Sequence, residues 1–187
     1  LKICDPAMGS GAFLVQVCRW LAERVVESWT AEEAKGKFVT AVGAVLHDGG
    51  ISDPMPTDTE ERLLVAKRLI AERCLYGADV NPLAVELAKL SIWLVTLAKG
   101  RPFAFLDHNL RCGDSLLGIH RLDQLTTLEM NPDRRRRQGR LFGRNVEAAV
   151  AEAIAVRERM RSIPIRDIGD VETLASMDME ARKKLRA

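Results

Sequence analysis

The chain has 187 residues, of which 47% are hydrophobic and 29% charged, and its formal net charge is +2. These values fit a globular protein of one domain or two small ones and exclude a disordered polar tract. No unbroken apolar stretch approaches the roughly 18 residues of a membrane span, and no signal peptide pattern opens the chain. We therefore expect a cytoplasmic location and no membrane partner. Because a strand pattern begins at Leu1 without a preceding Met, we also expect a piece of a longer protein.

Charge is distributed unevenly along the chain. Residues 131–187 hold 14 basic and 9 acidic side chains, a net of +5, whereas residues 1–130 hold 14 basic and 17 acidic ones, a net of −3. Six arginines fall within residues 134–144, which read either as a solvated loop or as a phosphate-binding segment. The cysteines form no C-x-x-C pair and are expected to be reduced, partly buried thiols: Cys4, Cys18, Cys74 and Cys112.

The first part of the chain predicts a strand followed by helices. Leu1–Cys4 is an apolar run that ends at a turn, and apolar residues from Ala12 to about Ser28 recur on one helical face. Residues 31–47 predict a second helix interrupted by glycines. Residues 49–56 are rich in Gly and Pro and predict a loop.

The next elements again place a strand between helices. Asp58 or Thr59 is suited to cap a helix that runs to about Arg73. Leu75–Ala78 predicts the second strand, and Asn81-Pro82 starts another helix. This helix is apolar nearly all round, so we expect it to be buried.

A third strand is predicted at Asn109–Cys112, and two further helices at Val146 to about Ser162 and at Val171–Ala187. Alternation of strands and helices predicts an α/β fold with a parallel sheet. Ligands of such sheets bind at the carboxyl ends of the strands. Three carboxylates would gather there: Asp5, Asp79 and Asp114.

Three segments at these strand ends carry the chemistry. Asp5-Pro6-Ala7-Met8-Gly9-Ser10-Gly11 is glycine-rich and precedes a helix, but Leu14 stands where a dinucleotide-binding fingerprint needs a third glycine. The whole string resembles motif I of S-adenosylmethionine-dependent N6-adenine DNA methyltransferases. Tyr76–Ala84 and Asn109–Leu116 resemble the next two motifs of that family, in the same order. The resemblance covers roughly residues 1–118. The intervening helix, Val85–Leu94, resembles that of the larger methylases of combined restriction–modification systems and related phage-defence methylases.

The resemblance implies S-adenosyl-L-methionine as the cofactor, with Asp79 holding the ribose hydroxyls and Asp114 the adenine amino group. Asp5 is the candidate carboxylate near the sulfonium, and Phe13 or Trp93 could face the cofactor. Read without the resemblance, Asp79 is a helix cap, Asp114 a turn residue and both aromatic rings core residues. The full set of implied cofactor residues is Asp5, Pro6, Ala7, Gly9, Ser10, Gly11, Phe13, Asp79, Val80, Asn81, Asp114 and Ser115.

The catalytic motif of that family, Asn/Asp-Pro-Pro-Tyr/Phe, is absent, because no Pro-Pro occurs in the sequence. We therefore expect no catalytic residue and no metal ligand in this chain. The implied fold is a partial Rossmann-like methyltransferase fold of about three parallel strands (residues 1–118). An Arg-rich loop (119–145) and a C-terminal helical insertion (146–187) follow. The first strand would expose an edge, which we expect to be covered by helices or by self-association.

The sequence thus predicts the S-adenosylmethionine-binding part of an adenine-N6 DNA methyltransferase, whose full-length protein would bind DNA. Two alternatives stay open. The first is a methyltransferase that acts on RNA or protein, and the second is a non-catalytic module for nucleic-acid binding or assembly. A nicotinamide-dependent enzyme is disfavoured by Leu14 and by the long insertion between Gly11 and Asp79.

Overall fold

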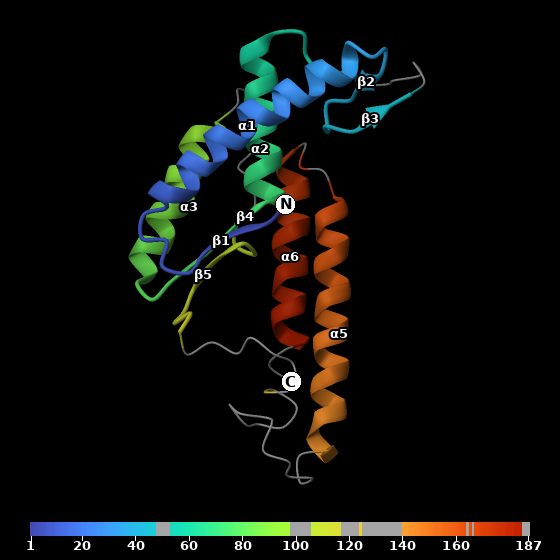
Figure 1. Cartoon of the computed structure of the whole chain (residues 1–187). Helices are drawn as coiled ribbons and strands as arrows, with labels where there is room; N and C mark the ends of the chain where they lie inside the picture. The colour runs from blue at the N-terminus through green and yellow to red at the C-terminus, as the bar shows by residue number, and fades with distance from the viewer. Residues whose placement is uncertain are drawn as a thin grey trace.

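The computed structural model describes residues 1–47, 53–97, 106–116, 124, 140–163, 165 and 167–184. The first half of the chain holds β1 (Ile3–Asp5), α1 (Ala12–Glu33), β2 (Phe38–Val39), β3 (Val45–Leu46) and α2 (Thr59–Arg73). The rest holds β4 (Leu75–Asp79), α3 (Pro82–Thr96), β5 (Leu110–Cys112), α5 (Arg140–Ser162) and α6 (Ile168–Lys184), as Figure 1 shows.

The central feature is a three-stranded parallel sheet in the order β1-β4-β5, so the predicted α/β fold with a parallel sheet is confirmed. One core cluster joins α1, α2 and α3 to the sheet, with Leu14, Leu75 and Ile92 almost fully buried. Because side chains alternate along a strand, Leu75 and Gly77 face these helices and Tyr76 and Ala78 face away. The three helices therefore cover one face of the sheet.

The other face of the sheet lies towards a helical hairpin. Antiparallel neighbours α5 and α6 share a second core, which includes Val156 and Leu174. Figure 1 shows α6 between α5 and the strands. Arg111 of β5 reaches α6 through an ion pair with Asp178. Cys4 on β1 is exposed and Tyr76 and Ala78 are half-buried, so the described residues cover this face only in part.

The second helix predicted over residues 31–47 is wrong. Helix α1 continues to Glu33 and is followed by a small antiparallel hairpin, β2–β3, which pairs Phe38 with Leu46. Gly36 and Gly43 have φ angles of 80° and 78°, which helices do not allow, so they end the helix and form the hairpin turn. Glycines that read as interruptions of a helix are turn residues here.

Helix α3 is only half buried, contrary to the sequence-based expectation. Its core side consists of Val85, Ala88, Ile92 and Thr96. Its opposite side is a row of exposed leucines: Leu83, Leu87, Leu90 and Leu94, continued by Leu97 after the helix. Although α3 is apolar on nearly all sides, only one side of it packs into the core.

The remaining predicted elements agree with the structure to within a few residues. Asp58 caps α2 by accepting a hydrogen bond from the Glu61 N–H at 2.9 Å, as expected. Helix α5 begins at Arg140, inside the segment predicted as an Arg-rich loop, whereas Arg134–Arg137 lie outside the described residues. Among the described helices, none combines the length and apolar character needed to cross a membrane.

Candidate cofactor-binding site

The three predicted motifs meet at the carboxyl edge of the sheet. Backbone hydrogen bonds join them: the Met8 N–H donates to the Ala78 carbonyl at 3.0 Å, and the Gly113 N–H donates to the Asp79 carbonyl at 2.9 Å. The Ser115 hydroxyl donates to the Pro6 carbonyl at 2.7 Å and so ties the third motif to the first. Segments more than 100 residues apart in sequence are thus brought to one edge.

Asp79 is the polar centre of this edge. One carboxylate oxygen accepts a hydrogen bond from the Gly9 N–H at 2.9 Å, and the other accepts one from the Asn81 N–H at 2.9 Å. Both N–H groups lower the pKa of Asp79 below its ordinary value, and the Asn81 N–H has the larger effect. The carboxylate is therefore ionised at neutral pH. A carboxylate oxygen can accept two hydrogen bonds, so each oxygen keeps one acceptor position that these two bonds do not use.

The glycine loop has an open side. Gly9 has a φ of 54°, and a Cβ added there would have no atom within 4 Å. The backbone at Gly9 can therefore be approached closely by a ligand. Gly11 has a φ of 80° and a different role, because a Cβ there would lie 3.1 Å from Cβ of Ala88 on α3. Gly11 thus permits the start of α1 to contact α3.

The other predicted residues flank this centre. Asp5 lies at the end of β1 and accepts a hydrogen bond from the Ala7 N–H at 3.1 Å. Asp114 follows β5 and accepts one from the Leu116 N–H at 2.9 Å, which is a turn geometry. Both acids therefore have local hydrogen bonds as well as a place at the edge. The predicted residues with exposed side chains are Pro6, Ala7, Ser10, Val80 and Ser115 in the loops and Phe13 in the first turn of α1.

Two of the alternative readings can be tested against this geometry. Asn81, not Asp79, is the N-cap of α3, since its side chain accepts from the Leu83 N–H at 3.0 Å. Asp79 is therefore not explained as a helix cap. Phe13 is 56% exposed, so it is not a core residue, while Trp93 is half-buried on α3.

Met8 is a residue that the sequence reading did not single out. It is 4% exposed and packs beneath the loop, where a Cβ on Gly77 would lie 2.3 Å from its sulfur. The glycine inside the strand pattern was the available signal, because such glycines often mark a close approach of another group. Across the described residues, no group of three His, Cys, Asp or Glu side chains is placed to bind a metal ion.

The comparisons with known proteins give one relevant match. The chain is 27% identical over 130 residues to a protein of Methanocaldococcus jannaschii that carries the provisional name type II restriction enzyme and methyltransferase. The match covers 63% of this chain and 9% of that protein, so the chain corresponds to a small part of its length. No family model and no solved structure matches the chain. The similarity gives a loose relationship to a protein of the restriction–modification class.

Proposed function

We propose that this chain is the S-adenosylmethionine-binding part of a DNA methyltransferase of a restriction–modification or related defence system, with the N6 of adenine as the methyl acceptor. The observation that supports it most is the ionised carboxylate of Asp79, held between the glycine loop and the start of α3. It stands at the end of the middle strand, where parallel α/β sheets bind their ligands.

The residues at this edge suit the cofactor. A ribose diol offers two donors, and the two oxygens of Asp79 would accept from them. Asp114 is placed to accept from the adenine amino group, and Asp5 would favour the positive sulfonium. The open side of Gly9 leaves room for the methionine part, and the exposed ring of Phe13 could cover it. The cofactor, when bound, supplies an electrophilic methyl group.

DNA adenine as the substrate rests on two supports. The order of the three motifs resembles the adenine-N6 methylases, and the related protein carries restriction enzyme and methyltransferase in its name. Transfer to a base needs the base outside the duplex and a pocket that holds it. The Asn/Asp-Pro-Pro-Tyr/Phe motif that builds this pocket in the family is absent from the sequence, so we assign no catalytic residue to this chain.

The direct test is calorimetric titration with S-adenosylhomocysteine of the chain and of Asp79→Asn. Hydrogen bonds to a charged group contribute about 1.5–3 kcal/mol, so we expect the variant to bind roughly ten- to a hundredfold more weakly. Asp53→Asn is the matched control, because Asp53 is an exposed carboxylate outside the site. Equal affinities of Asp79→Asn and Asp53→Asn would remove Asp79 from the site.

The substrate needs a second experiment on the full-length protein. Incubation with S-adenosylmethionine and DNA, followed by sequencing of modified bases, should give N6-methyladenine at a defined site. Methyl transfer to RNA or to protein in place of DNA would support the first alternative. Absence of cofactor binding by the folded full-length protein would support the non-catalytic one.

A further inference from the structure

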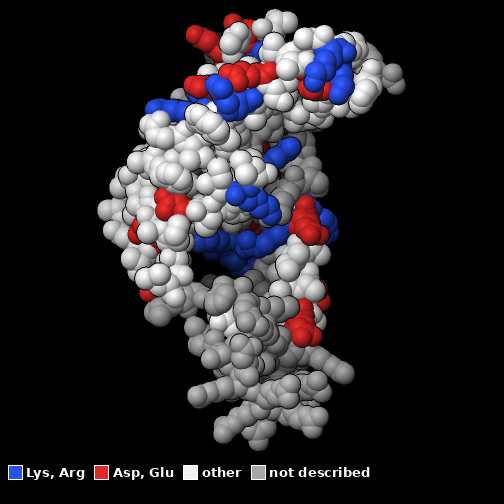
Figure 2. All heavy atoms as spheres, in the orientation of Figure 1, with Lys and Arg blue, Asp and Glu red and all other residues white. Residues whose placement is uncertain are grey.

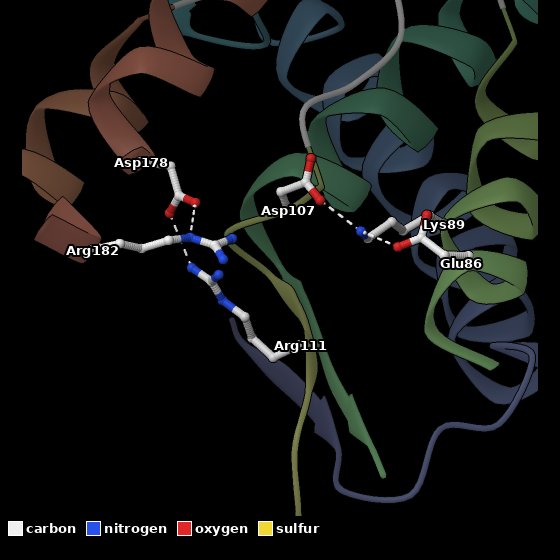
Figure 3. Close-up of polar contacts among 6 residues, drawn as sticks. All are labelled: Glu86, Lys89, Asp107, Arg111, Asp178 and Arg182. Carbon is white, nitrogen blue, oxygen red and sulfur yellow. Dashed lines mark hydrogen bonds and ion pairs between the residues drawn. The ribbon is translucent and has the colours of Figure 1, made fainter. Parts of the chain in front are cut away.

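Three arginines converge on one buried carboxylate beside the sheet. Asp178 of α6 has a side chain that is 4% exposed. One of its oxygens lies 3.0 Å from Nη2 of Arg111 and 3.4 Å from Nη2 of Arg157, and the other lies 2.6 Å from Nε of Arg182. Figure 3 shows Arg111 reaching from β5 to Asp178 and Arg182 on α6. We call Arg111, Arg157 and Arg182 the arginine cluster.

The charges of this cluster do not balance. Within the described part of the chain, Asp178 is the carboxylate that pairs with these three guanidinium groups within 4.0 Å, so two positive charges are in excess. Burial, together with repulsion from Arg182 and Arg157, lowers the pKa of Arg111 below its ordinary value. An additional anion near the cluster would relieve this repulsion.

The cluster is accessible and keeps unused donors. The side chains of Arg111, Arg157 and Arg182 are 31%, 32% and 45% exposed. Each uses one nitrogen on Asp178, whereas a guanidinium has five N–H donors. Figure 2 shows Lys and Arg side chains lining a hollow between the α/β part and the helical hairpin. A tetrahedral oxyanion could therefore reach several guanidinium groups at once.

We propose that the arginine cluster binds a phosphate group of the DNA backbone. Arginine forks pair bidentately with phosphate, and half or more of protein–DNA hydrogen bonds go to phosphate and sugar. The choice of DNA as the source of the phosphate rests on the proposed function. The cluster would hold one strand of the duplex beside the sheet, next to the helical hairpin.

The position of Arg111 makes this contact useful to the reaction. Arg111 lies in β5 three residues before Asp114, so at about 3.3 Å per residue their backbones are at most about 10 Å apart. A nucleotide that is turned out of the duplex stays attached to its backbone, so its phosphates must be held near the cofactor edge. A phosphate in the arginine cluster would meet this requirement.

The test measures duplex binding by fluorescence anisotropy between 50 and 200 mM salt. The variant is Arg157→Gln/Arg182→Gln, which leaves the Arg111–Asp178 pair intact. We expect weaker binding and a salt dependence whose slope falls by about one unit for each phosphate that the variant no longer binds. Arg24→Gln is the matched control, since Arg24 is similarly exposed, at 49%, and lies on α1. The same affinity and slope for both proteins would overturn the proposal.

Three further measurements complete the test. If the double Gln variant has an altered circular dichroism spectrum, Arg157→Gln alone replaces it, since its contact with Asp178 is the longest of the three, at 3.4 Å. The salt slope of this variant should fall by about one unit, and an unchanged slope would count against the proposal. Competition by free pyrophosphate without any duplex binding would overturn DNA as the source. Titration of S-adenosylhomocysteine into the same variants tests the proposed function separately, because the cluster lies outside the cofactor residues.

Discussion

Gly77 lies at a position where the neighbouring residues leave no room for a side chain. A Cβ at this residue of β4 would lie 2.3 Å from Sδ of Met8, 3.1 Å from Leu14 and 3.3 Å from Leu110. These neighbours come from the glycine loop, α1 and β5. They can meet over the middle strand because Gly77 has no side chain. The buried Met8 in turn anchors the loop that carries Gly9.

We predict that Gly77→Ala lowers the free energy of unfolding by about 1–3 kcal/mol, because the added methyl group overpacks the core. Gly113→Ala is the control, since a Cβ there meets no atom within 4 Å, and it should change stability by less than about 0.5 kcal/mol. Urea unfolding of both variants measures the difference. Equal stability of the two variants would show that the loop shifts to make room.

At the scale of elements, α3 presents two apolar sides with different roles. Its core side is anchored by Ile92, which is fully buried, whereas the outward side carries leucines that are 44–66% exposed. The outward residues from Leu83 to Leu97 are spaced alternately by four and three residues, which is the spacing of a coiled-coil seam. The leucine row is an exposed apolar surface, and among the described residues β1 pairs with β4 on one edge only. Self-association through the sheet edge stays a prediction.

Substitutions on the two sides of α3 should have unequal costs. Ile92→Ala should lower the free energy of unfolding by about 2–5 kcal/mol, because it leaves a cavity between α3 and the sheet. Leu90→Ala, on the same helix at 48% exposure, should cost well under half as much. Thermal or urea unfolding at a fixed protein concentration compares them. A large loss for Leu90→Ala would mean that its side of α3 is covered in solution.

At the scale of the whole molecule, Asp178 links the helical hairpin to the α/β part. Burial alone would raise the pKa of Asp178, but the hydrogen bond from Arg182 and the charge of Arg111 outweigh it and lower the pKa. A lowered pKa means that the ionised form is favoured when the hairpin is docked. The contribution to docking is therefore present above about pH 3.9, the ordinary value, and is lost as pH falls through the lowered pKa.

Removing this charge should release the hairpin at neutral pH. We predict that Asp178→Asn raises amide exchange along α6 at pH 7 and enlarges the radius of gyration in X-ray scattering. Three guanidinium groups would then lack their shared carboxylate. Glu180→Gln, a half-exposed residue of the same helix, should leave both measurements unchanged. If Asp178→Asn behaves like Glu180→Gln, the ion pair between Arg111 and Asp178 does not hold the hairpin in place.

Local signals explain which parts of the fold were predictable. The three parallel strands, the Asp58 cap and the start of α3 at Pro82 each follow from short patterns, and the structure confirms them. The hairpin β2–β3 was missed because strands of two residues are too short to show a period of two. The exposed side of α3 was missed because periodicity reports apolar character and not which side finds a partner.

One part of the candidate site was predictable, because the carboxyl ends of parallel strands lie at the same edge of a sheet. Asp5, Asp79 and Asp114 were placed there by the order of the strands alone. The hydrogen bond from the Gly9 N–H to Asp79 and the ion pair of Arg111 with Asp178 could not be predicted in this way. Their partners are 70 and 67 residues apart in the sequence. Contacts of this range have no local sequence signal.

The 70-residue separation of Gly9 and Asp79 also bears on how the protein folds. The hydrogen bond between the glycine loop and Asp79 depends on the pairing of β1 with β4, and that pairing closes a long loop that contains α1, the small hairpin and α2. Closure of such a loop costs entropy before any contact compensates for it, and parallel pairing of distant strands is slow. The helices rest on local contacts, whereas the carboxyl edge of the sheet is built from strands that are distant in the sequence. A small molecule that binds across that edge would stabilise the folded chain, because it binds the folded state and not the unfolded one.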